Sequence, residues 1–559
     1  MISEQENRYQ TKGEMGMKVL IIGGVAAGTK AAAKLKREDY NAEVTIITMG
    51  KDISYAGCGL PYYVGDVIHE KGQLIVNTPE SFEKLTGVHV ITETEAVKVN
   101  REDKTVEAVH TETGEKTLYS YDKLVIATGA SPIKPPMEGL DLEGIYFMRT
   151  PQDAISLRER IEKKDVKRAV VVGGGFIGLE VAENLAEQGI RVSVIDLAEH
   201  VLPGFDPEMA EYVENHLADQ GIMTFTGTKL EGFTGEGKLE KVKTSRKAMK
   251  ADIAVLSIGI RANTGFLEGS GIELMPNRTI KVNEFMQTND EDIYAAGDCA
   301  MVINRITGQP AWSPMGSSAN MEGRLLAGNI VGREKAYPGV LGTAVCKLPG
   351  LNAGRTGLTV AQAKAAGYDP VTVLTVVDDK AHYYPDAGSF IVKMIADKKT
   401  EKFLGIQVLG KGAVDKMVDI AVTALTMKAT VSDLENMDMA YAPPFSTAIH
   451  PFVHTVNILL NKMKGNFETF TPDEYESGEA EEYRLIDAAL QPALQGAEYV
   501  DLAKVTGPVD SLGKDEKLLL VCAKGKRAYM LQNRLKQFGY TNTRVLEGGT
   551  TFNNFDDEE

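Results

Sequence analysis

Cysteine is scarce in this sequence. Only Cys58, Cys299, Cys346 and Cys522 occur among 559 residues, and no two of them form a C-x-x-C pair. This scarcity excludes a disulfide-stabilised scaffold, and the spacing excludes a local zinc knuckle or a thioredoxin-type dithiol. We therefore expect no metal site, a reducing and hence cytoplasmic compartment, and thiol chemistry that runs on single cysteines.

Positive charge and long apolar runs are also in short supply. Lys and Arg number 61 against 78 Asp and Glu, which gives a net charge of −17. Contact with nucleic-acid phosphates needs a basic face, so we expect no nucleic-acid partner, and only a local basic pocket would hold a phosphorylated ligand. No apolar run reaches the ~18 residues of a membrane span, and the charged N-terminus lacks a signal-peptide core. We expect residues 1–15 to be a disordered leader.

Two stretches share one order of strand, small-residue loop and helix. Residues 18–36 read KVLIIGGVAAGTKAAAKLK, and residues 168–196 read RAVVVGGGFIGLEVAENLAEQGIRVSVID. A β-branched run that enters a glycine loop and then a helix is typical of a Rossmann-type nucleotide-binding unit. The repeat predicts an α/β fold with one flavin site and one nicotinamide site.

The second of these loops carries a complete G-x-G-x-x-G spacing at Gly173, Gly175 and Gly178. The first glycine makes the turn, the second lets the backbone approach a pyrophosphate, and the third lets the helix pack on the strand. Asp196 ends the next strand, where its carboxylate would bind a ribose 2′-hydroxyl and repel a 2′-phosphate. This unit therefore predicts NADH in preference to NADPH.

The first loop keeps its outer glycines, Gly23 and Gly28, but has Val25 between them. Thr48 ends the second strand of this unit, where an acidic residue more often binds the ribose. Asp298 follows a strand-like run in a Gly-Asp turn, where its carboxylate would hold a ribityl hydroxyl. These residues predict the flavin site.

Two further strand-like runs, residues 121–132 and 251–263, each end in a glycine. Nucleotides bind at the carboxyl ends of parallel strands, so residues at such ends are candidates for cofactor contacts. From these runs and the helix after the second loop we add Thr128, Gly129, Gly259 and Glu180 to the cofactor-binding candidates.

Cys58 lies in the small-residue loop SYAGCGLPYYVG. Where a two-cysteine disulfide reductase would have its second cysteine, this sequence has Tyr63. The flanking glycines leave the sulfur uncovered, so we interpret Cys58 as a catalytic residue that forms a mixed disulfide, a persulfide or a sulfenate. Cys299 and Cys346 lie in core-like strands and are interpreted as packing residues.

Cys522 begins a loop between the strand-like run LLLV and a helix, and Lys524, Lys526 and Arg527 follow it. Backbone amides, the helix N-terminus and the basic side chains would together favour a thiolate or a persulfide anion. We therefore interpret Cys522 as a second reactive cysteine.

The pattern changes towards the C-terminus. Residues 340–464 read as short alternating strands followed by helices, which predicts a separate α+β domain. Residues 465–482 contain seven acidic residues and little periodic apolar content, which is typical of a linker. His450 and His454 precede an amphipathic helix, and we interpret both as structural rather than as general bases.

Together these motifs resemble the single-cysteine branch of the pyridine nucleotide–disulfide oxidoreductases, in the form of coenzyme A disulfide/persulfide reductases with a C-terminal rhodanese domain. The resemblance covers about residues 16–559 and is carried by GGVAAG, SYAGCGLPYY, YDKLVIATGASP, VVVGGGFIGLEVAENL, AAGDCA, SSANMEGRLLAGNI, HYYPDAG and YAPPFS. It implies FAD, NAD(P)H, coenzyme A and a homodimer. It also implies an FAD-binding domain at 16–135 and 265–335, an NAD(P)H-binding domain at 136–264, a dimerisation domain at 336–464, the linker at 465–482 and a rhodanese-like domain at 483–559.

The resemblance implies substrate-binding residues as well. Lys34 and Arg37 match positions that bind the phosphates of coenzyme A, and Ser54 and Tyr55 match the segment that flanks the pantetheine.

Two tyrosines complete the implied catalytic set. Tyr383 and Tyr441 match tyrosines that reach the cysteine of the second subunit, where a phenol donates a hydrogen bond or a proton to a leaving thiolate.

The function predicted from sequence is flavin-dependent, NADH-driven reduction of coenzyme A persulfide or disulfide, extending to polysulfide, with rhodanese-like sulfur transfer. Two alternatives stay open. The first is an NADH oxidase or peroxidase, although those relatives have histidine at the position of Ala26. The second is a redox-sensing scaffold, since the C-terminal segment is short and lacks an E-x-x-x-G-H-I stretch after LIDA.

Overall fold

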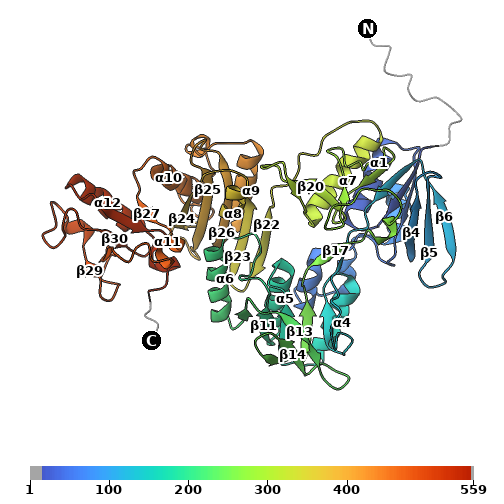
Figure 1. The fold of residues 1–559 in the computed structure, drawn as a ribbon, viewed down its shortest axis with the longest axis horizontal. Coiled ribbons are helices and arrows are strands. Elements are labelled where there is room, and N and C mark those ends of the chain that lie inside the picture. The colour runs from blue at the N-terminus through green and yellow to red at the C-terminus, as the bar shows by residue number, and fades with distance from the viewer. Residues whose placement is uncertain (1–15, 556–559) are drawn as a thin grey trace, which may run out of the picture. The chain divides into compact units, whose positions relative to one another are not determined.

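The computed structural model describes residues 16–555, and the leader expected at 1–15 lies outside them. Contacts divide the chain into two compact units. The first holds the chain up to Gly173 with Asn184–Arg191 and Leu230–Val340, and the second holds Gly174–Glu183, Val192–Lys229 and the chain from Leu341 onward. Both units combine helices with sheets, so the predicted α/β architecture is confirmed (Figure 1).

A parallel five-stranded sheet lies at the centre of the first unit, in the order β19–β7–β1–β2–β3. Its strands are β1 (Lys18–Ile22), β2 (Glu43–Ile47), β3 (His89–Ile91), β7 (Lys123–Ile126) and β19 (Ile293–Ala295). Four of the five residues of β1 are buried, as expected for a strand that is covered on both faces. Ile22 pairs with Ile47 and Ile126, and Ala295 pairs with Ile126, so the loops that follow these strands leave at one edge.

Two helices pack together in this unit, α1 (Ala26–Glu38) and α7 (Gly316–Ile330). A Cβ added to Gly323 would lie 2.4 Å from the carbonyl oxygen of Ala27, so only glycine permits this approach. Leu35 of α1 and Leu326 of α7 are buried in the same apolar cluster as Ile21 of β1. The helices therefore hold the loop between β1 and α1 against the sheet.

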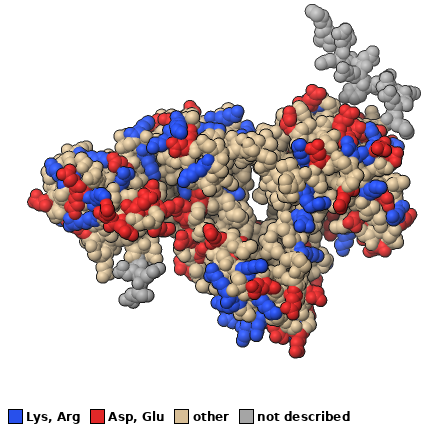
Figure 2. Space-filling model, viewed as in Figure 1, with Lys and Arg blue, Asp and Glu red and all other residues tan. Residues whose placement is uncertain are grey.

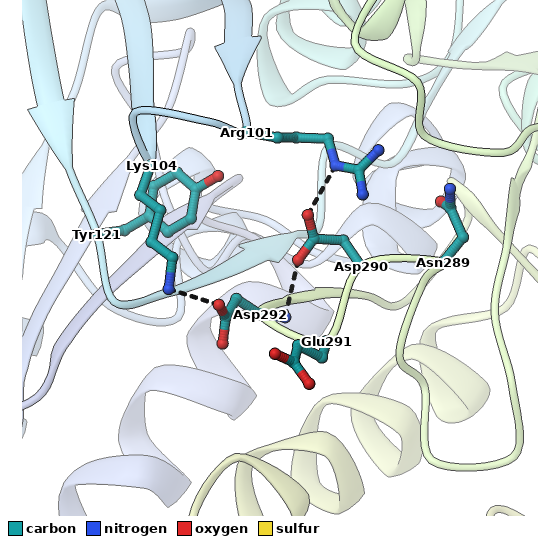
Figure 3. A pocket seen from close by; sticks show the side chains of 7 residues that line it. All are labelled: Arg101, Lys104, Tyr121, Asn289, Asp290, Glu291 and Asp292. Atoms are coloured by element: carbon teal, nitrogen blue, oxygen red, sulfur yellow. Dashed lines mark hydrogen bonds and ion pairs between the residues drawn. The ribbon is translucent and has the colours of Figure 1, made fainter.

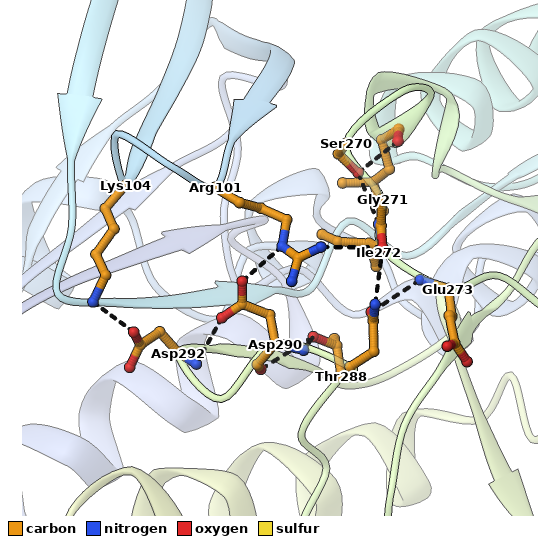
Figure 4. A network of polar contacts seen from close by, with 11 residues as sticks. Arg101, Lys104, Ser270, Gly271, Ile272, Glu273, Thr288, Asp290 and Asp292 are labelled. Atoms are coloured by element: carbon orange, nitrogen blue, oxygen red, sulfur yellow. Dashed lines mark hydrogen bonds and ion pairs between the residues drawn. The ribbon is translucent and has the colours of Figure 1, made fainter.

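A three-stranded antiparallel sheet, β4 (Thr94–Asn100), β5 (Thr105–His110) and β6 (Lys116–Ser120), is tied to the residues before β19. Arg101 Nε lies 2.7 Å from an Asp290 oxygen, and Lys104 Nζ lies 2.5 Å from Asp292 (Figure 4). Lys123 also pairs with Asp292, at 2.5 Å. Arg101, Lys104 and both aspartates line a polar cavity of about 350 Å³ that contains none of the predicted site residues (Figure 3). We interpret these ion pairs as structural contacts that hold the β4–β5 turn against the segment before β19, since both aspartates have cationic partners.

Residues 136–264, the expected NAD(P)H-binding domain, contribute to both units. In the first unit, β10 pairs in parallel with β16, and β16 pairs in parallel with β9. In the second, β11 pairs in parallel with β12 and is followed by α6. The bounds are β9 (Ile145–Phe147), α4 (Pro151–Glu162), β10 (Arg168–Val172), α5 (Phe176–Glu187), β11 (Arg191–Ile195), α6 (Pro207–Asp219), β12 (Met223–Phe225) and β16 (Ile253–Leu256).

The second unit contains a five-stranded antiparallel sheet in the order β22–β23–β26–β25–β24. All eight residues of β26 are buried, and helices α9 and α10 pack on the sheet. The bounds are β22 (Ala344–Leu348), β23 (Leu351–Gly357), β24 (Pro370–Asp378), β25 (Ser389–Asp397), β26 (Phe403–Gly410), α9 (Val414–Thr426) and α10 (Pro451–Met463).

The C-terminal part of this unit is a parallel sheet in the order β27–β31–β30–β28–β29. Its elements are β27 (Thr469–Phe470), β28 (Arg484–Asp487), β29 (Glu498–Tyr499), β30 (Leu518–Val521), α12 (Lys526–Gln537) and β31 (Thr543–Leu546).

The segment 465–482 differs from the linker that its acidity predicts. Strand β27 lies within it and pairs with β31, and Phe470 is buried in the same apolar cluster as Val521. The next helix, α11 (Pro472–Glu476), uses its acidic residues locally, since Thr471 and Glu474 form a capping box. Burial of one aromatic side chain and helix capping therefore order a segment that composition alone describes as loose.

A buried carboxylate joins the C-terminal sheet to the antiparallel sheet. Glu547 follows β31, and its side chain is 1% exposed. It accepts hydrogen bonds from the Leu374 backbone N–H at 2.7 Å and from the Thr469 hydroxyl at 2.6 Å. Lys462 Nζ, on α10, also lies 2.5 Å from it. The C-terminal domain is thus fastened to β24 and α10.

Within residues 16–555, no helix is both long enough and apolar enough to cross a bilayer. The same residues contain no group of three or more His, Cys, Asp or Glu side chains placed to hold a metal ion. On the face that Figure 2 shows, acidic and basic side chains are interspersed.

Replacing Glu547 with Gln should loosen the C-terminal domain. The amide leaves the Lys462 ammonium without its counter-charge and one donor poorly satisfied, which costs about 1–3 kcal/mol. The measurement is the midpoint of the earliest urea unfolding transition of the full chain. Glu482→Gln is the matched control, because Glu482 is 78% exposed where it pairs with Lys517. Equal shifts in the two variants would contradict the role of Glu547.

Candidate active site

The loop between β1 and α1 is shaped to receive an anion. Gly23 has φ +111°, and an added Cβ there would lie 2.1 Å from the Ala127 carbonyl oxygen. A Cβ on Gly28 would lie 1.9 Å from the Gly23 carbonyl oxygen. No side chain caps α1 at Val25, and its first turn has no acidic residue. Its backbone N–H groups therefore remain for a ligand such as a pyrophosphate, and these residues fit the predicted dinucleotide.

The predicted flavin residues meet at the carboxyl edge of the parallel sheet. Gly23 follows β1, Thr48 follows β2, Thr128 and Gly129 follow β7, and Asp298 follows β19. The Thr128 hydroxyl donates a hydrogen bond to the Asn263 carbonyl at 2.8 Å, which fixes the loop after β7. The sheet order thus brings together residues that are 275 positions apart at the extremes, from Gly23 to Asp298.

Arg149 was missed by the reasoning from sequence. Its Nη2 donates a 2.7 Å hydrogen bond to Asp298 Oδ2, and the Trp312 indole donates to the Asp298 carbonyl at 2.9 Å. Arg149 lies just before Thr150, the N-cap of α4, so the capping motif was the only available signal. A cation beside Asp298 suits a site that holds phosphorylated cofactor.

Glu322 was missed as well. Its carboxylate, on α7, accepts a 2.7 Å hydrogen bond from the Gly297 N–H, and the residue is 2% exposed. Burial raises the pKa of Glu322 to about 7, although the Gly297 N–H opposes the shift. Glu322 therefore supports the Gly-Asp turn from the side of the helix.

Cys58 lies in the short helical turn Gly57–Gly59, which continues into α2 (Leu60–Val64), and its side chain is exposed. Arg158 on α4 donates to the carbonyl oxygens of Tyr63 at 3.1 Å and Ile68 at 3.0 Å. Its guanidinium also lies 4.5 Å from the Tyr63 ring centroid. Arg158 thus holds the C-terminal end of the helix that presents Cys58.

A cavity of about 350 Å³ opens between α1 and the segment before Cys58. Arg37, Ser54 and Tyr55, three of the predicted substrate-binding residues, line it together with Lys30. Lys34 does not, because its ammonium forms an ion pair with Glu38. The full lining is Val25, Ala26, Thr29, Lys30, Ala33, Arg37, Ser54, Tyr55, Val76, Asn77, Phe82 and Asn320.

Helix geometry places Lys30 at this cavity together with Arg37. Residues 26, 30, 33 and 37 recur at intervals of three and four, so they form one stripe along α1. Lys34 lies one turn beyond Lys30, about 40° from it around the helix, but its ammonium is engaged by Glu38. The sequence showed the basic side chains but not the ion pair that engages one of them.

Tyr55 connects this cavity to the expected flavin site. Burial raises the pKa of its phenol, and the charges of Arg149 and Asp298 act on it in opposite directions. The cavity wall is therefore within electrostatic reach of the Asp298 turn.

The second glycine loop has a backbone conformation like that of the first, and its residues are divided between the two units. In the first unit, Gly173 has φ +111°, and an added Cβ would lie 2.3 Å from the Ser257 carbonyl oxygen; Gly259 has φ +106°. In the second, Asp196 accepts from Gly174 N–H at 2.6 Å and from Ala198 N–H at 2.8 Å. Gly175 immediately precedes α5, and an added Cβ there would meet open space. Gly178 and Glu180 lie on α5 itself.

Tyr383 and Tyr441 lie in the second unit, and both are exposed. A hydrogen bond between its hydroxyl and Tyr383 raises the pKa of the Tyr441 phenol. The structure therefore brings these two predicted residues together, although 58 positions separate them, from 383 to 441.

The surroundings of Cys522 differ from the strongly basic loop that the sequence predicts. Cys522 is 4% exposed, and its sulfur accepts the Ala528 N–H at 3.4 Å. Lys524 is bonded to Asp378, and Arg527 forms an ion pair with Asp501 at 3.6 Å. Two of the three cations are therefore engaged by carboxylates, and the Ala528 N–H is the group that contacts the sulfur.

His450 is the N-cap of α10, and its Nδ1 accepts the Phe452 N–H at 3.2 Å. Burial lowers its pKa to about 4, so the ring is neutral at pH 7. This geometry agrees with a structural role.

Comparison with known proteins gives these features a family context. Residues 17–315 match the family described as pyridine nucleotide-disulphide oxidoreductase, and residues 343–452 match its dimerisation domain. A solved structure of an NAD-dependent persulfide reductase from A. fulgidus matches with a TM-score of 0.91 at 36% identity, covering 96% of this chain and 100% of that chain.

Two curated relatives carry different names. The NAD(P)H coenzyme A polysulfide/persulfide reductase of Pyrococcus horikoshii is 36% identical over 446 residues, which is 80% of this chain and 99% of the relative. A Methanocaldococcus jannaschii protein named NADH oxidase is 35% identical over 448 residues, with 80% and 99% covered.

Replacing Gly28 with Ala should release the flavin. The new Cβ overlaps the Gly23 carbonyl, and relieving that overlap displaces α1 from the anion-binding loop. The flavin content of the purified protein, read from its absorbance, should fall about tenfold or more, the equivalent of ~1.4 kcal/mol. Gly72→Ala is the control, since an added Cβ there meets nothing within 4 Å. Full flavin content in Gly28→Ala would overturn the assignment.

Proposed function

The chain belongs to the pyridine nucleotide-disulphide oxidoreductases, an enzyme family, and we propose that it reduces coenzyme A persulfide or disulfide with NADH. In this proposal FAD binds at the first glycine loop, NADH binds at the second, and Cys58 is the single redox cysteine. Polysulfide is a further acceptor, and the cysteine content supports a cytoplasmic setting.

One observation carries the proposal. An exposed cysteine, Cys58, lies three residues after Tyr55, and Ser54 and Tyr55 line a cavity that is also lined by Lys30 and Arg37. A long thiol with phosphates at its far end matches that arrangement, because the cations would bind the phosphates while the thiol end reaches the cysteine.

The cofactors supply the electrons. When bound, FAD would take a hydride from NADH and deliver two electrons to sulfur. Gly23, Gly28 and Asp298 would hold the FAD, and Asp196 beside Gly174 supports NADH over NADPH because its carboxylate would repel a 2′-phosphate.

The proposed sulfur chemistry at Cys58 uses NADH, acting through the flavin, as its source of electrons. The Cys58 thiolate attacks the outer sulfur of coenzyme A persulfide, the S–S bond breaks, and the coenzyme A thiolate leaves. Cys58 is then a persulfide, and two electrons with protons convert it to the thiol and release hydrogen sulfide. With the disulfide as substrate, Cys58 forms a mixed disulfide, whose reduction releases a second coenzyme A.

A homodimer would complete the site. The match of residues 343–452 to a dimerisation domain supports such an assembly. In it, Tyr383 and Tyr441 of one copy would serve the Cys58 of the other by donating a proton to the leaving thiolate. Their exposure in the single chain and their mutual hydrogen bond support this role.

Cys522 would carry sulfane sulfur in a rhodanese-like reaction. Its position at the end of β30, with an N–H of α12 directed at the sulfur, supports a stabilised thiolate or persulfide. We place it upstream of Cys58, as a donor of sulfur to coenzyme A.

An oxygen-reducing activity is the second candidate, because the Methanocaldococcus jannaschii relative is named NADH oxidase. Ala26, on α1 at the first glycine loop, offers no imidazole to stabilise a sulfenate, which favours sulfur over oxygen as the acceptor.

The test is NADH oxidation with coenzyme A persulfide, coenzyme A disulfide, polysulfide and oxygen, each measured alone at equal concentration. The proposal expects the coenzyme A substrates to give the highest kcat/KM. Faster turnover with oxygen alone would establish the oxidase, and negligible turnover with every acceptor would favour a redox-sensing scaffold.

Cys58→Ser should abolish turnover with every sulfur acceptor. NADH should still bleach the flavin in a stopped-flow experiment, because Cys58 accepts electrons after the flavin. Cys346→Ala, which removes a buried thiol, is the control and should retain turnover. Sulfur reduction by Cys58→Ser would exclude the proposed role.

Lys30→Met and Arg37→Met should each raise KM for coenzyme A persulfide about tenfold, as expected for loss of a charge-assisted hydrogen bond of about 1.5 kcal/mol. KM for a short alkyl persulfide that lacks phosphates should stay unchanged. Lys34→Met, on the same helix but outside the cavity, should have the smaller effect. If both substrates weaken equally, the cations do not bind the phosphates.

A further inference from the structure

One lysine fastens the Cys522 loop to the antiparallel sheet. Lys524 Nζ donates hydrogen bonds of 2.7 Å to Asp378 Oδ1 and of 2.7 Å to Ser389 Oγ. Asp378 and Ser389 face each other as the last pair of the β24–β25 ladder. They therefore close the base of the loop 379–388, which carries Tyr383.

The Asp378–Ser389 pair belongs to a regular antiparallel ladder. The β24–β25 register runs without interruption from Pro370–Asp397 to Asp378–Ser389. Beyond it, the Asp379 carboxylate accepts the Gly388 N–H at 2.8 Å, so the tyrosine loop is closed by its own contacts. The Cys522 loop is the part that Lys524 positions.

The other side of the Cys522 loop is also confined. The Cys522 carbonyl accepts the Thr550 N–H at 3.2 Å, and a Cβ on Gly549 would lie 1.9 Å from the same oxygen. Glu547, two residues earlier, is bonded to β24 through the Leu374 N–H. The Cys522 loop is therefore held between the segment after β31 and the Asp378–Ser389 pair, to which Lys524 is hydrogen-bonded.

Side chains of the antiparallel domain also face this loop. His454, on α10, is half-buried, and the charges of Lys526 and Asp378 act on it in opposite directions. The polar surroundings of the Cys522 loop thus come from the antiparallel domain as well as from the C-terminal domain.

We propose that Lys524 is a positioning residue, which holds the Cys522 loop on the Asp378–Ser389 rung so that sulfane sulfur leaves Cys522 beside the Tyr383 loop. This proposal rests on the sulfur transfer proposed for Cys522. In the step concerned, a coenzyme A thiolate attacks the outer sulfur of the Cys522 persulfide, a new S–S bond forms, and Cys522 leaves as a thiolate. The step needs no oxidant or reductant, because sulfur passes between two thiols.

The geometry argues against activation of the thiol as the main role of Lys524. Its ammonium is directed to Asp378, whereas the Cys522 sulfur is contacted by the Ala528 N–H. The two roles predict different effects on the acidity of the thiol, so they are separable by experiment.

The first measurement is hydrogen exchange of the full chain, which is independent of any activity. In Lys524→Met, peptides covering 522–528 should exchange about two- to fivefold faster, as expected for loss of a partly exposed ion pair. Peptides covering 379–388 should keep their rate. Lys517→Met is the matched control, because Lys517 pairs with Glu482 inside the same domain at 46% exposure, against 39% for Lys524. Unchanged exchange at 522–528 in Lys524→Met overturns the proposal.

The second measurement compares two reactions of the same variants. NADH oxidation driven by thiosulfate plus coenzyme A needs Cys522, whereas oxidation by preformed coenzyme A persulfide needs only Cys58. Lys524→Met should slow the first about two- to fivefold, in proportion to the loosening of the loop. It should leave the second unchanged. The double variant Lys524→Asp with Asp378→Lys should restore the first reaction.

Equal slowing of both reactions, or no rescue by the charge exchange, overturns the proposal. A changed pH profile for alkylation of Cys522 in Lys524→Met also overturns it, because it would make the lysine an activator of the thiol. Cys522→Ala is run in parallel. If that variant retains the first reaction, the proposed sulfur transfer fails, while the exchange data still decide whether Lys524 holds the loop.

Discussion

The close approach of backbone segments at the carboxyl edge of the β19–β7–β1–β2–β3 sheet is the constraint on which the candidate site depends. At Gly23 the chain passes so near Ala127 that a Cβ would lie 2.1 Å from its carbonyl oxygen, and Gly28 lies equally close to Gly23. This contact brings the N-terminus of α1 to the edge where β7 and β19 also end. The amides at the N-terminus of α1, the Thr128–Gly129 turn and Asp298 therefore share one edge because the backbone, rather than any side chain, sets their separation.

Buried carboxylates hold segments that are distant in the sequence against one another. Glu322 binds the turn before Asp298, and Glu547 binds the edge strand of the antiparallel sheet. A third case is Glu208, which contacts the buried ammonium of Lys393; burial raises the pKa of Glu208 to about 7. A buried carboxylate is costly unless its donors are in place, so each of these acids specifies one arrangement of the segments that supply the donors. The C-terminal domain is therefore part of a defined surface, and sulfur transfer from Cys522 would begin at a fixed position.

Burial also sets Cys299 and Cys346 apart from the exposed Cys58. Cys299 and Cys346 are buried, and burial raises the pKa of the Cys299 thiol to about 11 and that of Cys346 in the same direction. Both thiols therefore stay protonated at neutral pH and do not compete for an electrophilic sulfur. Cys58 is exposed in a short helical turn, and Cys522, although buried, has a helix N–H directed at its sulfur. These are the two cysteines for which the sulfur chemistry is proposed.

Local requirements could be inferred from the sequence alone. The two glycine loops, the lone cysteine of the SYAGCGLPYY motif and the α/β class follow from backbone conformations and spacings that neighbouring residues impose, and the family membership follows from the same motifs. Contacts between distant segments could not be inferred in this way. Glu38 engages Lys34 while Lys30 lines the cavity, the pairing of β27 with β31 orders the acidic segment 465–482, and the last residue pair of the β24–β25 ladder engages Lys524. Each depends on which surfaces pack together, and packing energy is summed over the whole fold, so no short window of sequence contains it.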